Sequence, residues 1–149
     1  MIKLLTALTL LLALCLTGCS SSREQEYPAQ DLDVKFYRAG GVSGMTDGLT
    51  IAGTGWVRFW TGRSVQMSTV TDSLRLEERQ FDRIALLTKS DELYSYHSQT
   101  SGELSTTISV RNGSRTAIIT YAGTSMPDGA PGALKDLLDE LTHISKPTH

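Results

Sequence analysis

The spacing of apolar residues changes period along this chain, and this change limits the fold more than any other feature. From Asp33 to Trp60 apolar and polar residues alternate, which is typical of strands with one buried face. Over residues 75–88 the period becomes helical. Alternation returns over 106–121, and a second helical stripe follows Pro131. The sequence therefore predicts strands, a helix, strands and a final helix, in that order.

The expected elements follow from these periods. Strands are predicted near 33–38, 47–52, 56–60 and 64–70, and residues 89–102 are predicted to form a polar loop. The helix at 75–88 carries an apolar stripe of Phe81, Ile84, Ala85 and Thr88. The stripe of the last helix consists of Leu134, Leu137, Leu138, Leu141 and Ile144.

Asn112-Gly113 gives the clearest local signal in the sequence. Between two alternating runs this dipeptide favours a type I′ hairpin turn, which needs positive φ at both positions. Such a turn would place Ile108 opposite Ala117, and Thr106 opposite Ile119. One face of the hairpin would then carry Ile108, Val110, Ala117, Ile119 and Tyr121.

These elements predict the fold class. Strands joined by short turns favour an antiparallel sheet, and two amphipathic helices must bury their stripes against it. We expect an α+β fold, with about six antiparallel strands and two helices packed on one sheet face. Residues 32–145 would form a single domain, between a flexible tether at 19–31 and a tail at 146–149.

The N-terminus has the features of a secretory leader. Lys3 precedes an apolar run that is shorter than a typical transmembrane helix. The run ends in Leu-Thr-Gly-Cys at residues 16–19, which resembles a bacterial lipobox. That resemblance implies a signal peptide over residues 1–18, cleavage between Gly18 and Cys19, and lipid on the Cys19 thiol. The alternative is an ordinary signal peptide that is cut near Gly18 and leaves Cys19 unmodified.

Lipid on Cys19 would determine where the protein resides. Each buried methylene of an acyl chain contributes about 0.8 kcal/mol, so several chains together hold a protein firmly on a membrane. The expected location is the cell envelope. Ser20, rather than Asp, follows the cysteine, which resembles the sorting pattern of outer-membrane lipoproteins. In a Gram-negative host this implies the outer membrane, facing the periplasm.

The sequence gives no indication of a disulfide, a metal site, a nucleic-acid interface or a catalytic site. The chain has two cysteines, and Cys15 would leave with the leader while Cys19 carries lipid, so no disulfide or Cys-based zinc site is expected. The three histidines, His97, His143 and His149, have no metal-ligand spacing. A net charge of −2 argues against nucleic-acid binding. We therefore expect no catalytic residues, metal or cofactor, and no enzymatic activity.

An alternating Trp-rich run offers a candidate binding surface. Trp56, Arg58 and Trp60 should project from one face of their strand, and Val57 and Phe59 from the other. Trp and Arg are enriched among the residues that dominate protein interfaces. Either the tryptophans lie exposed and bind a partner, or they form the core; the residues leave both alternatives open.

The run from Phe36 to Gly44 contains Arg-x-Gly-Gly-x-x-Gly and resembles the strand entry of the emfourin-like family of small bacterial proteins. The similarity continues to Ile144. It implies an α+β domain without catalytic residues, and the family's founding member inhibits thermolysin-like metalloproteases. The residues that it adds as interaction candidates are Arg38, Gly40, Gly41 and Gly44.

Together these features predict a non-catalytic, lipid-anchored envelope protein that acts through protein contact. Lipid on Cys19 would attach the protein to the membrane. The protein partner is unidentified, and in the more specific hypothesis it is a thermolysin-like metalloprotease. The alternatives are a small-ligand-binding or a structural envelope lipoprotein. Hydrolase activity is the alternative that the residues favour least.

Overall fold

The computed structural model describes residues 31–41, 43–100 and 102–146. The predicted leader at 1–18, the cleavage site at Gly18 and Cys19, and the tether up to residue 30 lie outside the described residues. So do residues 147–149 of the predicted tail. None of the helices in the described ranges is long and apolar enough to cross a membrane.

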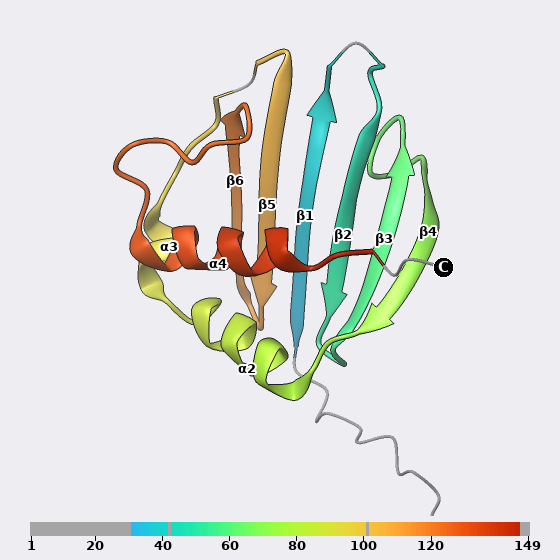
Figure 1. Ribbon diagram of the computed structural model, residues 1–149. Coiled ribbons are helices and arrows are strands. Elements are labelled where there is room, and N and C mark those ends of the chain that lie inside the picture. Colours follow the sequence, from blue (N-terminus) through green and yellow to red (C-terminus); the bar gives the residue numbers. More distant parts are fainter. Residues whose placement is uncertain (1–30, 42, 101, 147–149) are drawn as a thin grey trace, which may run out of the picture.

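The fold is α+β, as predicted. Six antiparallel strands form one sheet in the order β4-β3-β2-β1-β5-β6. The first four strands follow one another as a meander, and the chain then returns through helices to place β5 beside β1 (Figure 1). The elements are β1 (Leu32–Gly40), β2 (Thr46–Ala52), β3 (Trp56–Gly62), β4 (Ser68–Arg75), α2 (Glu78–Leu87), α3 (Asp91–Ser95), β5 (Leu104–Asn112), β6 (Arg115–Ala122) and α4 (Gly132–His143).

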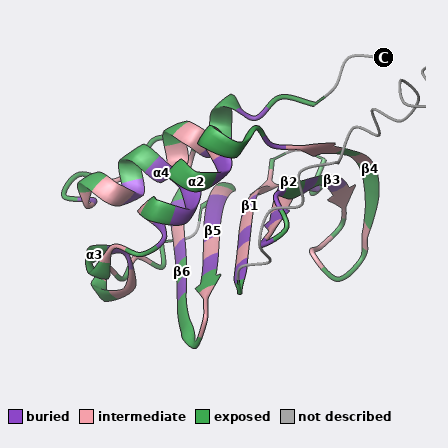
Figure 2. Cartoon of the chain, turned by 90° about the horizontal axis from the view of Figure 1, so that it is seen from below, coloured by how far each residue is buried: buried purple, intermediate pink, exposed green. Residues whose placement is uncertain are grey.

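Helices α2 and α4 cover one face of the sheet, and the core lies between them and the strands (Figure 2). The alternation predicted from sequence puts one apolar row across five neighbouring strands, and every member of the row is buried. That row consists of Phe59, Leu49, Phe36, Ile108 and Ile119. The buried residues of the helices pack against it: Phe81, Ile84 and Ala85 from α2, and Leu134, Leu137 and Leu141 from α4.

The fourth strand and the first helix begin later than predicted. A strand was expected at 64–70, but β4 starts at Ser68 and continues to Arg75, where the helix was expected to begin. Leu74 lies opposite the buried Val57, so pairing with β3 extends the strand. Because cross-strand pairing is a tertiary effect, local periodicity did not reveal it.

The predicted hairpin register was wrong by two residues. Asn112 pairs with Arg115, so the turn consists of Gly113 and Ser114. Only Gly113 has positive φ, at 60°, which is the pattern of a type II′ turn. The Asn112 amide instead donates a hydrogen bond of 3.0 Å to the hydroxyl of Thr88. A two-residue shift preserves which side chains face the core, so the predicted apolar face is present.

The predicted polar loop at 89–102 contains a third helix, α3. Its single buried residue, Leu93, reaches the core, and the Tyr94 hydroxyl donates to the Thr88 carbonyl at 2.7 Å. From β6, Arg115 lies 3.8 Å from the centre of the Tyr94 ring and pairs with Asp91 at 2.8 Å. Five residues make too few turns to produce a periodic stripe, so sequence periodicity missed this helix.

Candidate functional site

The Trp-rich strand lies on the sheet face that the helices leave uncovered. Val57 and Phe59 are buried in the core, so the opposite side of β3 carries Trp56, Arg58 and Trp60. Of the two sides of this strand, the one with Val57 and Phe59 therefore faces the core, and binding of a partner by the tryptophan side stays a prediction. Trp56 is 41% exposed and Arg58 is exposed as well.

Trp60 differs from Trp56, because it is only 5% exposed on the same face. Its indole Nε1 donates to the Thr50 hydroxyl at 3.2 Å, and its ring lies 5.7 Å from that of Tyr37. A Cβ atom at Gly48 would approach Trp60 Cζ2 to 2.9 Å and Tyr37 Cβ to 2.5 Å. Gly48 therefore lets the indole lie across β2. Trp60 is therefore packed against β2, and little of its ring is accessible to a partner.

Trp56 and Arg58 remain as the accessible pair of the predicted trio. Arg58 lies opposite Thr50 on β2 and Ser73 on β4. It makes no ion pair within 4 Å among the residues that the structure describes. An exposed indole next to an uncompensated guanidinium is a favourable combination for binding a protein. We call Trp56 and Arg58 the open-face pair.

The three motif glycines form the connection between β1 and β2, away from the open-face pair. Gly40, Gly41 and Gly44 all have positive φ, at 106°, 76° and 59°. A Cβ at Gly40 would collide with the backbone of Glu103, whereas nothing lies within 4 Å of a Cβ at Gly41 or Gly44. The Gly41 amide also donates to the Glu103 carbonyl at 2.8 Å. The glycines thus let β1 end closely against the start of β5.

A cavity of about 330 Å³ lies on the helix-covered side of the sheet, next to the end of α4. Its apolar lining comes from Phe36, Leu49 and Phe59 on the strands, and from Leu141 and Ile144 at the end of α4. All five side chains belong to the core. The cavity is therefore an open pocket at the edge of the core, beside the end of α4.

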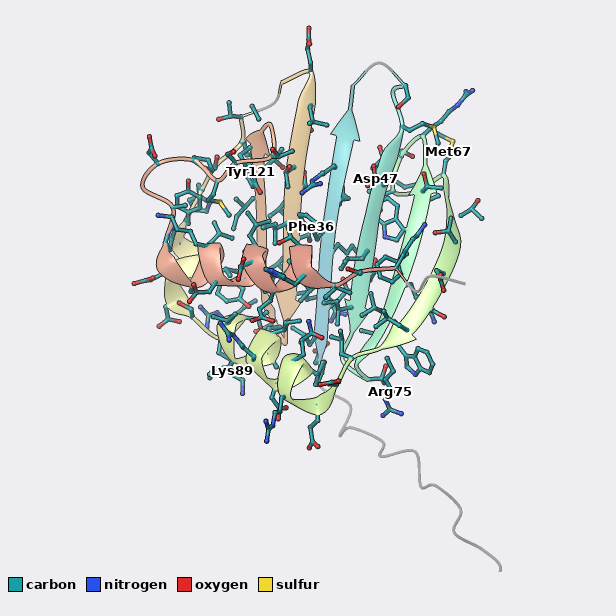
Figure 3. The ribbon with its side chains drawn as sticks, viewed as in Figure 1. Phe36, Asp47, Met67, Arg75, Lys89 and Tyr121 are labelled. Carbon is teal, nitrogen blue, oxygen red and sulfur yellow. The ribbon has the colours of Figure 1, made fainter. Side chains whose placement is uncertain are left out.

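Arg38 faces this cavity, on the opposite side of the sheet from the open-face pair. It belongs to a cross-strand row next to the apolar row described above, and this second row is mainly polar. Figure 3 shows two members, Asp47 and Tyr121, beyond Phe36 on the strands behind α4. The full row is Thr61, Asp47, Arg38, Thr106 and Tyr121.

The Arg38 side chain contacts an aromatic ring but forms no ion pair with another described residue. Its guanidinium lies 5.5 Å from the centre of the Phe36 ring, and its Nε atom is buried without a hydrogen-bond partner. Asp47 and Lys146 line the same cavity and were not among the predicted site residues. The signal for Asp47 was present in the sequence, because it alternates with Leu49 and Ile51 and so had to face the core side.

The hydroxyl of Tyr121 is buried at the other end of the polar row. Burial raises the pKa of this phenol, while the neighbouring Thr106 hydroxyl and the Arg38 charge oppose the rise. Thr106 is close to the phenol but donates its proton to the Gly123 carbonyl at 2.6 Å, and no group among the described residues has the geometry of a hydrogen bond with the Tyr121 hydroxyl. The phenol oxygen therefore contributes a desolvation cost without a compensating hydrogen bond.

Replacing Tyr121 with Phe should leave the stability at neutral pH unchanged or raise it by up to about 1 kcal/mol. Because the folded-state pKa of Tyr121 lies above the unfolded value, the wild type should lose stability as the pH rises above about 10. The variant should lose less. Urea unfolding at pH 7 and 10.5 checks both effects. Tyr94→Phe is the comparison and should cost about 1 kcal/mol at pH 7, since it removes a hydrogen bond. A cost above 2 kcal/mol for Tyr121→Phe would contradict the unpartnered hydroxyl.

Within the described ranges, no three His, Cys, Asp or Glu side chains gather closely enough to hold a metal ion. No protein-family model matches the sequence, and no curated protein matches it. The resemblance to the emfourin-like family therefore stays a prediction, carried by the motif from Arg38 to Gly44 and the order of the elements.

Proposed function

We propose that this chain is a non-catalytic lipoprotein of the cell envelope, anchored through Cys19, that binds a protein partner with the uncovered face of its sheet. In the more specific version the partner is a thermolysin-like metalloprotease, which the domain inhibits. The family resemblance of the motif at 38–44 supports this choice of partner.

One observation carries the proposal: Trp56 is 41% exposed on a sheet face that none of the described helices covers, beside Arg58, which forms no ion pair with another described residue. Exposing an indole to water has a cost that a partner would remove, because fully burying a large apolar side chain contributes about 1.5–3 kcal/mol. Buried Val57 and Phe59 hold the strand in place from the other side. The pair is thus presented on a rigid element, which lowers the entropy lost on binding.

An inhibition assay tests the metalloprotease version. The purified chain is titrated into a thermolysin-like protease, and hydrolysis of a peptide substrate is followed. We expect activity to fall with added chain until it is suppressed. Unchanged hydrolysis at a high molar excess would contradict the proposed inhibition of a metalloprotease. A different protein partner would then have to be sought.

Lipid anchoring is tested separately with the two cysteines of the chain. We expect Cys19→Ser to abolish incorporation of labelled fatty acid and to leave the precursor uncleaved, because the thiol is the predicted acceptor. Cys15→Ser is the matched control, and it should be labelled and processed like the wild type. Gel mobility and labelling in cells measure both. Continued labelling of Cys19→Ser would refute the assignment.

A further inference from the structure

The cavity beside α4 holds two opposite charges that do not pair with each other. Arg38 and Asp47 lie directly opposite on β1 and β2, and both line the cavity. Neither takes part in an ion pair of 4 Å or less with any residue in the described part of the chain. The Arg38 guanidinium instead lies over the Phe36 ring, with its Nε buried and unpartnered. A cation and an anion are thus both available to a ligand.

The charge around the cavity is nearly balanced, which argues against a simple anion as the ligand. Asp47 is one negative group, and the C-terminal end of α4, where Leu141 and Thr142 line the wall, adds a partial negative charge. Arg38 lies on the sheet, and Lys146 adds a second positive group at the rim. Lys146 and Asp47 are both exposed, so solvent screens the charge of each. A ligand that carries one positive and one negative group matches this arrangement better than a ligand with a single charge.

Most of the remaining side chains in the lining are apolar, and Thr61 and Thr142 are its uncharged polar members. Phe36, Leu49 and Phe59 form the surface next to the charged pair, and Leu141 and Ile144 face it from α4. The volume of about 330 Å³ is at the small end of the range for small-molecule sites, roughly 300–1,000 Å³. The site therefore suits a compact molecule with an apolar group of moderate size.

We propose that this cavity binds a small amphipathic zwitterion with the chemistry of a free apolar α-amino acid. The ligand carboxylate lies on the Arg38 guanidinium, which can donate two hydrogen bonds in a planar fork. The ligand ammonium lies on Asp47 and towards the carbonyl end of α4. The apolar side chain fills the space next to Phe59. This site is on the opposite side of the sheet from the open-face pair, so the inference does not depend on the proposed function.

Three probes of similar size test the contribution of each charged group of the ligand separately. L-Phenylalanine carries both, 3-phenylpropanoate lacks the ammonium, and 2-phenylethylamine lacks the carboxylate. We expect phenylalanine to bind the purified full chain at least about tenfold more tightly than either analogue, because charge-assisted hydrogen bonds are the strong ones. Calorimetry measures the affinities. Shifts of the Leu141 and Ile144 methyl signals by the probe ring would report the location.

Two substitutions then assign each charge. Arg38→Gln should weaken phenylalanine and 3-phenylpropanoate about tenfold and strengthen 2-phenylethylamine, because it removes a repelling guanidinium. Asp47→Asn should weaken phenylalanine and 2-phenylethylamine but strengthen 3-phenylpropanoate, because it removes a repelling carboxylate. Arg79→Gln is the matched control, since it removes the same charge from an exposed position on α2 that does not line the cavity, and it should leave the three probe affinities unchanged. Asp47 is exposed, so its variant keeps the test valid if Arg38→Gln does not fold.

The inference would be overturned by any of three results. The first is no binding of phenylalanine at millimolar concentration. The second is equal affinity for phenylalanine and 3-phenylpropanoate, which would point to a simple carboxylate site. The third is an unchanged phenylalanine affinity in Asp47→Asn.

Discussion

Replacing Gly40 with Ala is expected to destabilise the protein by about 2–6 kcal/mol. The φ of 106° is a conformation that side chains avoid, at a cost of about 1–3 kcal/mol. The new Cβ would also collide with the backbone at Glu103, which cannot move without breaking the pairing of β1 with β5. Such overpacking adds about 1–3 kcal/mol. Since small domains are stable by only about 5–15 kcal/mol, this change would remove a large share of the stability and lower the melting temperature by many degrees.

Gly41→Ala and Gly44→Ala are the matched controls in the same loop. Both positions have positive φ but open space around the missing Cβ, so each should cost only about 1–2 kcal/mol. Thermal and urea unfolding compare the three. Equal melting of Gly40→Ala and Gly41→Ala would contradict the close approach to Glu103. If Gly40→Ala loses function, the cause would be its lower stability and not the loss of a contact with a partner.

The sheet could be predicted because its strands bury one face. Alternation in sequence fixes which side chains share a face, so the core row that includes Phe36, Leu49 and Ile108 was accessible to sequence reasoning. The hairpin register was not, since tertiary contacts decide it. Asn112 stays in the strand with its amide on Thr88, and Gly113 alone supplies the positive φ that the turn needs.

The candidate surfaces were only partly accessible from the sequence. The exposure of Trp56 depends on which face the helices cover, and the burial of Trp60 depends on the missing side chain at Gly48, one strand away. The cavity at Arg38 exists because α4 ends over the sheet, beside Ile144. Positions of this kind are set by the packing of distant segments, which local patterns do not encode.

Replacing Trp56 with Ala should weaken binding to the protein partner by about 30-fold or more, because an interface tryptophan typically contributes 2 kcal/mol or more of binding free energy. The loss of stability should be much smaller, since the side chain is 41% exposed in the free protein. With a metalloprotease partner the measured quantity is the inhibition constant, and the melting temperature checks that the variant is folded.

Leu86→Ala is the control for loss of an exposed apolar side chain. Leu86 is 68% exposed on α2, on the helix side of the molecule, so its removal should leave the inhibition constant unchanged. A Trp56→Ala variant that binds like wild type, or a Leu86→Ala variant that loses as much, would place the interface elsewhere.

Site-specific photocrosslinking in the cell envelope tests the central claim most directly. A photoreactive phenylalanine analogue is placed at position 73, opposite Arg58 on the uncovered sheet face, and in a second strain at position 86 on α2. We predict a discrete adduct with one protein from position 73 and none from position 86. No adduct from position 73, or the same adduct from both positions, would contradict binding through the uncovered face of the sheet.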